Sequence, residues 1–185
     1  LYKARNKAIQ KAKGAFIAFL DTDDTWKKNK LNDQVKVLKK NPLIKIFYSN
    51  YICFFQETKK KISKFNFKLP SGFITQNLLN LNFIGINTLL IDKKIFKKYK
   101  FNEKLNIIGD FDLLINLSLK FRILAIQQPL SFYRIHKNNY SKNTEIYLSE
   151  MLEWNKKNKR KLLSKKFNLS KINFMLVKLR IKVIL

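Results

Sequence analysis

The chain has 185 residues, of which 46% are hydrophobic, so it is long and apolar enough to fold, and general disorder is excluded. Its 39 Lys and Arg residues against 12 Asp and Glu give a formal charge of +27, which suits an anionic partner such as nucleic acid or a membrane surface. The lysines are spread along the whole chain, however, which also fits solvated faces without any partner.

The single cysteine and the hydropathy pattern further limit the class of protein to which the chain can belong. Cys53 is the single cysteine and lies in an apolar run, which excludes a disulfide framework and a CxxC metal site and predicts a small buried hydrophobe. No apolar stretch reaches the length of a membrane span and no signal peptide is recognisable, which predicts a cytoplasmic protein. The chain begins at Leu1 without an initiator Met, which predicts a fragment.

The first third of the chain alternates between helical and strand patterns. Apolar residues at helical spacing predict a helix over residues 1–12, ended by Gly14. Residues 16–20 are apolar without alternation, as in a buried strand covered on both faces. A helix is predicted over 30–39, ending before Pro42, and a second strand over 44–55.

The alternation continues to about residue 135. The expected elements are, in order, a hairpin or loop at 57–68, a helix at 73–81, a strand at 84–91, a helical turn at 93–98, a helix at 110–120, a strand at 121–127 and a short segment from Pro129. Alternating strands and helices predict an α/β fold with a mainly parallel sheet and helices on both faces.

The C-terminal part differs in composition. Residues 144–166 predict a long lysine-rich helix, and residues 171–185 mix apolar residues with Lys178, Arg180 and Lys182. A basic amphipathic helix of this kind can lie on an anionic membrane surface. The alternative is that it packs against the rest of the domain or against a missing continuation of the chain. We therefore divide the chain into a domain at 1–143 and a basic helical extension at 144–185.

Three carboxylates follow the first strand in the sequence AFIAFLDTDDTW: Asp21, Asp23 and Asp24. Like charges this close raise each other's pKa, so a cation is expected nearby. Ligands of open α/β sheets bind outside the carboxyl ends of strands, and Mg²⁺ or Mn²⁺ prefers oxygen ligands. On an extended segment Asp21 and Asp23 would face one crevice and Thr22 would point elsewhere. The alternative is an N-cap cluster for the following helix.

The order of several motifs resembles the family 2 glycosyltransferases, nucleotide-sugar enzymes with a GT-A fold. ARNKAI, KGAFIAFLDTDDTW and KLNDQV are similar to the family's ARN-x-G-I, G-x-x-I-A-F-L-D-x-D-D-x-W and K-L-x-x-Q. INTLLIDKKIFKKYKFNEKL, GDFDLLINLS and PLSFYRIHKNNYS resemble later family segments. The resemblance covers residues 4–141 and implies a GT-A sheet with C-terminal helices added.

The resemblance implies a donor site around the first strand. Asp23 matches the metal-binding acid of the D-x-D motif, which holds a divalent cation, Mg²⁺ or Mn²⁺, on the donor's diphosphate. Asp21 matches the acid that contacts the sugar nucleotide, Asp24 matches a residue that orients the donor sugar, and Arg5 lies in the motif beside the nucleotide. His136 matches a histidine that completes the metal site in some relatives, although a structural role for it is equally open.

The resemblance also implies which residue acts as the catalytic general base. Asp110 matches the general base of inverting members, which would take the proton of the acceptor hydroxyl. Gly109 stands where the family usually has Glu, and Ala8 replaces a usual Gly. The family's first strands, with the loop that holds the nucleotide base, are missing, which predicts an N-terminally truncated GT-A domain.

The function expected from these motifs is an inverting, metal-assisted glycosyltransferase. It would use a nucleotide-diphosphate sugar and a glycan or lipid-linked acceptor in cell-surface polysaccharide or glycolipid synthesis. We expect it in the cytoplasm, in contact with an anionic membrane at the cytosolic face of the inner membrane. The alternatives are an inactive truncated remnant and a basic nucleic-acid-binding module. The aromatics lie mostly in apolar runs rather than exposed among basic residues, so nucleic acid is not the expected partner.

Overall fold

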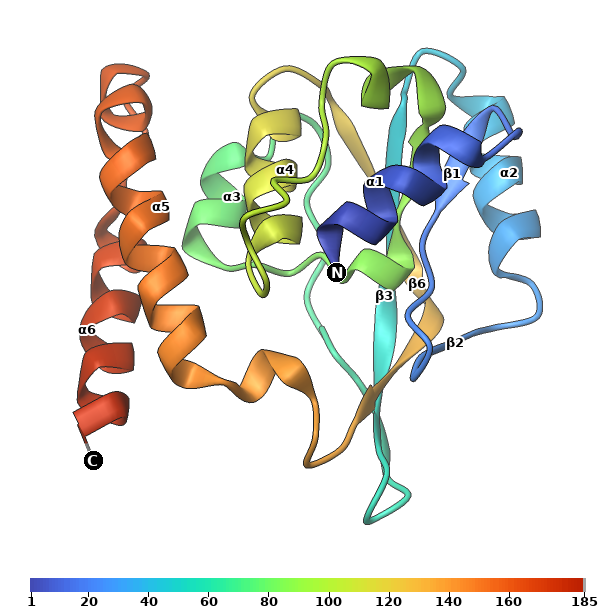
Figure 1. Cartoon of the computed structure of the whole chain (residues 1–185). Helices are drawn as coiled ribbons and strands as arrows, with labels where there is room; N and C mark the ends of the chain where they lie inside the picture. The colour runs from blue at the N-terminus through green and yellow to red at the C-terminus, as the bar shows by residue number, and fades with distance from the viewer. Residues whose placement is uncertain (185) are drawn as a thin grey trace.

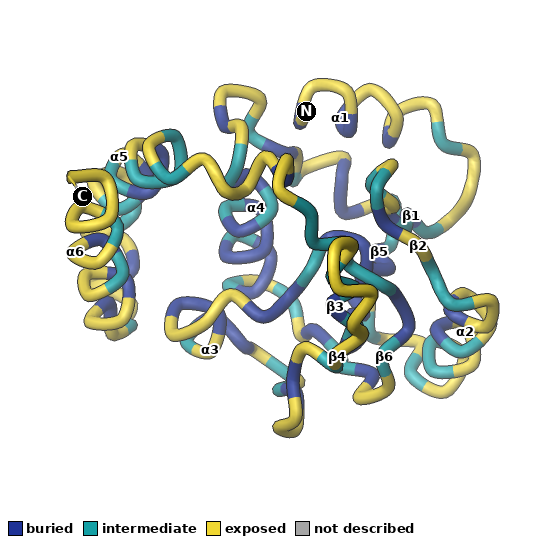
Figure 2. The backbone as a smooth tube through the Cα atoms, turned by 90° about the horizontal axis from the view of Figure 1, so that it is seen from below, coloured by how far each residue is buried: buried dark blue, intermediate teal, exposed yellow. Residues whose placement is uncertain are grey.

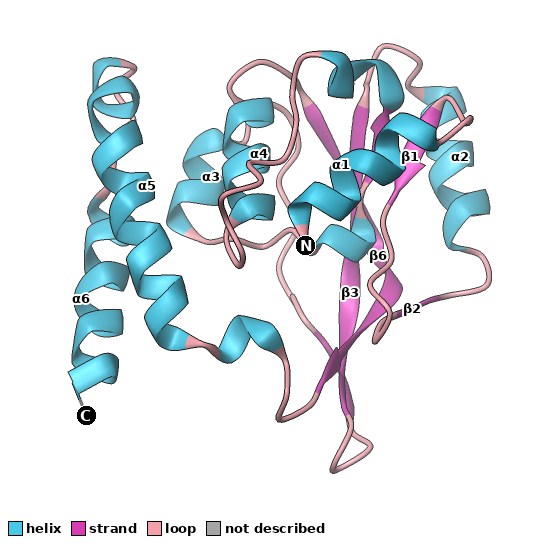
Figure 3. Ribbon diagram, in the orientation of Figure 1, coloured by secondary structure: helices cyan, strands magenta, loops and turns pink. Residues whose placement is uncertain are grey.

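The computed structural model describes residues 1–184 and shows a six-stranded sheet with helices on both faces (Figure 1, Figure 3). The strand order is β1-β5-β3-β6-β2, and β4 pairs with the far end of β3 as a hairpin. The strands are β1 (Phe16–Ala18), β2 (Thr25–Trp26), β3 (Ile46–Phe55), β4 (Lys61–Ser63), β5 (Leu90–Asp92) and β6 (Ile123–Ile135).

The helices form layers outside the sheet. α3 and α4 lie on one face with the α5–α6 hairpin outside them, and α2 lies on the other face (Figure 1, Figure 2). The helices are α1 (Tyr2–Lys11), α2 (Lys30–Lys40), α3 (Thr75–Asn80), α4 (Gly109–Ser118), α5 (Thr144–Ser164) and α6 (Ser170–Ile184). Short 3-10 turns are η1 (Ile86–Thr88), η2 (Lys93–Lys97) and η3 (Tyr140–Lys142).

The α/β class is confirmed, but the predicted mainly parallel sheet is wrong. Only the β3–β6 pair is parallel within the described sheet, whereas β1–β5, β3–β5, β2–β6 and β3–β4 are antiparallel. An apolar run indicates that a strand is buried, not in which direction it runs. The sheet is therefore mixed.

Two predicted strands have different bounds in the structure. The run 84–91 contains η1 and only the short β5, because Thr88 Oγ1 donates to the carbonyl of Gly85 and closes a turn. The strand predicted to end before Pro129 instead continues to residue 135. The register of β6 against β3 shifts at Asn50, and the proline falls at this irregularity, where a missing backbone N–H is tolerated.

The buried core runs through the sheet into the C-terminal helices. Ile46 and Leu114 are fully buried and belong to the same cluster as Trp154 and Leu176. The buried Glu150 carboxylate of α5 accepts the backbone N–H groups of residues 106–108, just before α4, at 2.5–3.0 Å. The predicted division at residue 143 remains a prediction. Among residues 1–184, no helix combines the length and the apolarity needed to cross a bilayer.

Candidate active site

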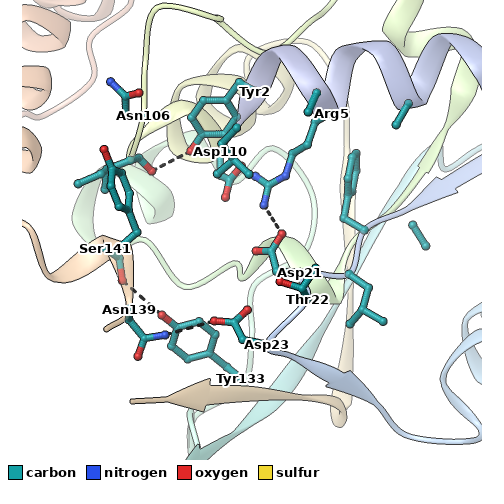
Figure 4. Close-up of a pocket in the computed structure, with 18 of the residues that line it drawn as sticks. Tyr2, Arg5, Asp21, Thr22, Asp23, Asn106, Asp110, Tyr133, Asn139 and Ser141 are labelled. Atoms are coloured by element: carbon teal, nitrogen blue, oxygen red, sulfur yellow. Dashed lines mark hydrogen bonds and ion pairs between the residues drawn. The ribbon is translucent and has the colours of Figure 1, made fainter. Parts of the chain in front are cut away.

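The loop that follows β1 opens into a cavity of about 900 Å³ (Figure 4). α1, the N-terminus of α4 and the segment after β6 complete its walls. Five of the six residues expected at the site line this cavity: Arg5, Asp21, Asp23, Asp110 and His136. Segments that are far apart in the sequence therefore meet at one side of the sheet.

Arg5 forms ion pairs with two acids of the site, Asp21 in the loop after β1 and Asp110 in α4. Its Nη2 atom lies 2.5 Å from Asp21 Oδ1, and its Nη1 atom lies 2.7 Å from Asp110 Oδ1. Only 9% of the Arg5 side chain is exposed, and its guanidinium carbon lies 5.4 and 5.7 Å from the ring centroids of Tyr2 and Phe101. A planar, permanently charged guanidinium can bond two carboxylates at once, which an ammonium does less well.

Asp110 sits in the first turn of α4 and is partly shielded from solvent. Burial raises its pKa to about 7, Arg5 opposes this rise, and the negative charge of Asp21 adds to it. A carboxyl group that titrates near neutrality can hold or release a proton at working pH. This is the property required of a general base.

Asp23 and His136 form the second polar group of the cavity. Asp23 Oδ2 lies 3.1 Å from His136 Nε2, and Asn139 Nδ2 lies 3.5 Å from the same oxygen. Arg134 Nε donates to the Asp23 carbonyl at 2.7 Å, which fixes the backbone of the loop. Within residues 1–184 no group of three or more His, Cys, Asp or Glu side chains is arranged to hold a metal ion.

One carboxylate and one imidazole are too few to hold an ion alone, so an ion at this pair would need other ligands as well. Mg²⁺ commonly takes only one or two protein carboxylates and completes its shell with waters and substrate phosphates. The Asp23 side chain is 39% exposed and lines the cavity with His136 as its neighbour, so both would be available as ligands.

The four residues of DTDD are arranged as a turn, not as an extended segment. The backbone N–H of Asp24 donates to the carbonyl of Asp21 at 3.1 Å, so the expected alternation does not hold and Thr22 also lines the cavity. The N-cap alternative is wrong as well, because β2 separates the turn from α2.

Asp24 does not line the cavity, unlike the other expected residues. It is 6% exposed, and its carboxylate accepts hydrogen bonds from Asn87 Nδ2 at 2.6 Å and from the backbone N–H of Arg134 at 2.9 Å. Burial raises its pKa to about 6. In this structure Asp24 therefore holds the turn to β6 and η1, and the donor contact implied for it stays a prediction.

Sequence reasoning missed the polar residues that complete the wall. Tyr133, Asn139 and Ser141 lie at the opposite side of the cavity from Arg5, and Asn106 lies beside α4 (Figure 4). Asn139 is nearly buried and bonds both Asp23 and the carbonyl of Arg134. Its place in the HKNNYS segment, three residues after His136, is the signal that could have found it.

The asparagine of the ARN motif has a structural task. Asn6 Nδ2 donates to the Phe101 carbonyl at 2.9 Å and to Glu103 Oε1 at 3.0 Å, and Asn6 Oδ1 accepts the Phe101 N–H. The FNE segment is thereby fixed to α1. This contact places the Phe101 ring against Arg5.

Gly109 faces the ring of Tyr2. A Cβ atom at Gly109 would lie 2.5 Å from Tyr2 Cζ and closer still to Cε2, far inside contact distance. The Tyr2 ring is fully buried, stacks on Phe101 at 5.4 Å, and its hydroxyl donates to the Ile107 carbonyl. The space that a larger residue at 109 would occupy is therefore filled by Tyr2.

Comparisons with known proteins show which family this chain is similar to. Residues 1–100 match the family model described as Glycosyl transferase family 2. An uncharacterised glycosyltransferase of Methanocaldococcus jannaschii is 29% identical over 85% of this chain and 56% of its own length. The UDP-Glc:alpha-D-GlcNAc-diphosphoundecaprenol beta-1,3-glucosyltransferase WfgD of Escherichia coli is 36% identical over 53% of this chain and 37% of its own length.

A solved structure extends the comparison to the fold. The crystal structure of S. aureus TarS 1-349 superposes with a TM-score of 0.52 at 16% identity, over 81% of this chain and 42% of that one. This supports the GT-A fold and nothing finer. The chain spans about half the length of the curated relatives it matches. Because the family model covers more than half of its residues, the chain belongs to glycosyl transferase family 2.

Proposed function

We propose that the chain transfers a sugar from a nucleotide-diphosphate sugar to a hydroxyl acceptor with inversion at the anomeric carbon. The observation that carries this proposal is the bridge formed by Arg5 between Asp21 and Asp110 in the wall of the 900 Å³ cavity. It sets a carboxyl group suited to proton transfer beside an acidic turn suited to a diphosphate with its cation.

In the proposed reaction, the acceptor oxygen attacks the anomeric carbon and the bond from that carbon to the diphosphate oxygen breaks. Asp110 takes the proton of the acceptor hydroxyl, and the nucleoside diphosphate leaves. One displacement inverts the configuration, unlike a retaining glycosidase, in which a second carboxylate forms a covalent intermediate. The raised pKa of Asp110 supports this role.

A divalent cation, Mg²⁺ or Mn²⁺, is part of the proposal. Asp23 and His136 would hold it, and it would stabilise the negative charge that grows on the leaving diphosphate. Asp21 would lie on the nucleotide-sugar side of the same turn, held there by Arg5. Asn139 would keep Asp23 and its loop in position.

The acceptor that we propose is a glycan or a lipid-linked glycan. The name of the relative WfgD includes a diphosphoundecaprenol-linked acceptor and a UDP-sugar donor, which supports this class. The product would then belong to a cell-surface polysaccharide or glycolipid. The reaction would take place at the cytosolic face of the membrane.

Donor binding tests the proposal without an identified acceptor. Titration calorimetry with a panel of UDP-, GDP- and dTDP-sugars in the presence of Mn²⁺ should detect one bound donor. Asp23→Asn should weaken its affinity at least about tenfold, because a charged ligand to the cation is lost. The control Glu57→Gln changes an exposed acid of the β3–β4 hairpin and should bind as the wild type does. Binding unaffected by Asp23→Asn, or no binding by any donor, would contradict the proposal.

A further inference from the structure

The outermost helix, α6, is apolar on two opposite sides. One side packs inward through Ile172 and Leu176, which are buried against α5 and α3. Apolar residues on the other side remain exposed. Figure 2 shows α6 at the edge of the molecule, beyond α3 and α4. A helix with a single apolar face would be sufficient to pack on the domain.

The exposed side is a continuous stripe. Phe174, Val177, Ile181 and Ile184 are 57%, 53%, 53% and 83% exposed. At about 3.6 residues per turn they project from one side of the helix, so they form one surface and not scattered contacts. We call these four residues the outer stripe. Contiguous exposed apolar surface of this kind marks a contact site.

Basic side chains flank the outer stripe. Lys171, Lys178 and Lys182 lie along one flank by helical spacing and Arg180 lies on the other, and α6 contains no acid. Lys178 Nζ is 4.5 Å from the centroid of the Phe174 ring. The whole segment 144–185 has eleven Lys and Arg against three Glu. The surface thus combines an apolar centre with a cationic margin.

Apolar surface also continues beyond the helix. A cavity of about 430 Å³ adjoins the stripe between α3 and α6, and Phe174, Met175 and Leu81 line it, with Lys171 and Lys178 among its residues. Leu81, at the end of α3, is half exposed. The apolar area therefore extends from α6 onto α3.

We propose that this surface binds an anionic lipid bilayer, with the outer stripe in the boundary between headgroups and acyl chains and the flanking basic residues on lipid phosphates. The charge pattern favours a bilayer because cations around an apolar stripe match anionic headgroups above hydrocarbon. Nucleic acid is less well matched, since only one of the four stripe residues is aromatic and could stack on a base. This inference does not depend on glycosyl transfer.

The test is co-sedimentation of the full chain with vesicles of phosphatidylcholine, with and without phosphatidylglycerol. The wild type should bind the anionic vesicles and release them at high salt. The double variant Val177→Ser/Ile181→Ser should lose binding by at least about tenfold, because two aliphatic side chains no longer enter the bilayer. Lys171→Gln/Lys178→Gln should reduce binding only to the anionic vesicles.

A matched control uses exposed leucines on the far side of the molecule. Leu31→Ser/Leu43→Ser alters α2 and the turn after it, which lie across the sheet from α6 (Figure 1), and should bind as the wild type does. Circular dichroism and the thermal midpoint should match the wild type for all three double variants, which excludes unfolding as the cause of lost binding.

Three results would overturn the proposal. The first is binding to anionic vesicles that Val177→Ser/Ile181→Ser leaves unchanged. The second is a chain that binds no vesicles and whose dimer, detected by light scattering, is broken by this variant, since the stripe would then join two copies. The third is a chain that binds no vesicles but binds an oligonucleotide through Lys171 and Lys178.

Discussion

The guanidinium of Arg5 is shared between Asp21 and Asp110, whose Oδ1 atoms lie 2.5 and 2.7 Å from its two terminal nitrogens. One cation thus offsets the repulsion of two acids in a partly buried site. The pKa of Asp110 is nevertheless raised to about 7, because burial outweighs the attraction to Arg5. The site keeps a carboxyl group that is half protonated near neutrality.

This shift makes the stability of the chain depend on pH. The pKa of Asp110 is about 7 in the folded chain and about 3.9 when unfolded, so the protonated form favours folding. Its contribution is complete below about pH 4 and is lost as the pH rises through about 7. The difference between these two pKa values corresponds to about 4 kcal/mol. Asp110→Asn is neutral at every pH but also loses the ion pair with Arg5, so it should raise the free energy of unfolding at pH 8 by less, about 1–2 kcal/mol relative to the wild type.

Urea unfolding at several pH values measures this difference. The advantage of Asp110→Asn over the wild type should shrink between pH 8 and pH 5, because the wild-type carboxyl becomes protonated. The exposed-site control Glu57→Gln should show no such trend. A difference between Asp110→Asn and the wild type that is the same at both pH values would show that Asp110 is not perturbed.

At the scale of elements, the start of α4 depends on the close approach of α1. Gly109 permits the Tyr2 ring to pack where a Cβ atom would lie 2.5 Å from Cζ of that ring. Tyr2 cannot move outward easily, since it is fully buried and stacked on Phe101. Gly109→Ala should therefore lower the free energy of unfolding by about 1–3 kcal/mol, although alanine usually favours a helix.

Gly14→Ala is the matched control for this substitution. Gly14 has a negative φ, and the nearest atom to a Cβ at this position, the Phe16 carbonyl oxygen, would be 3.4 Å away, so alanine fits there. Denaturant unfolding should show Gly14→Ala equal to or slightly more stable than the wild type. Equal free energies of unfolding for the two alanine variants would mean that the Tyr2 ring can move aside without destabilising the fold, which would contradict the prediction.

The elements themselves are largely predictable from the sequence. The helices predicted at 30–39, 110–120 and 144–166 lie within a few residues of their observed bounds, because their apolar residues recur at helical spacing. The run 84–91 forms a strand only at its end, in β5, because Asn87 and Thr88 make side-chain bonds that fold the earlier part into a turn. The spacing of apolar residues gives no information on side-chain hydrogen bonds to residues that are distant in the sequence, such as the bond from Asn87 to Asp24.

The site is predictable to a similar degree. Motif order identifies Arg5, Asp21, Asp23 and Asp110, and the structure brings all four to one cavity. The order of motifs does not reveal that Asp24 turns away from the cavity to bond Asn87, or that Asn139 bonds Asp23. Which acid of DTDD faces the cavity depends on a turn closed by a backbone hydrogen bond, and the sequence carries no direct signal for it.

At the scale of the whole molecule, the proposed donor site and the proposed bilayer surface are two separate surfaces. Asp110 lines the large cavity on one side of α4, and the adjacent Phe111 lines the smaller cavity beside α3 and α6. The proposed donor site and the proposed bilayer surface thus adjoin the same helix. Part of the excess positive charge, which the sequence could not assign to one partner, lies on α6, where four Lys and Arg residues flank the outer stripe.

Sugar transfer measured against pH tests the central claim most directly. Nucleoside diphosphate release from the donor found by titration, with a lipid-linked glycan as acceptor, should show a wild-type kcat/KM that rises with pH through about 7, as Asp110 loses its proton. Asp110→Asn should lower the rate by about 10²–10⁴-fold while it still binds the donor. Transfer by Asp110→Asn at the wild-type rate, or a wild-type rate indifferent to pH, would contradict the account.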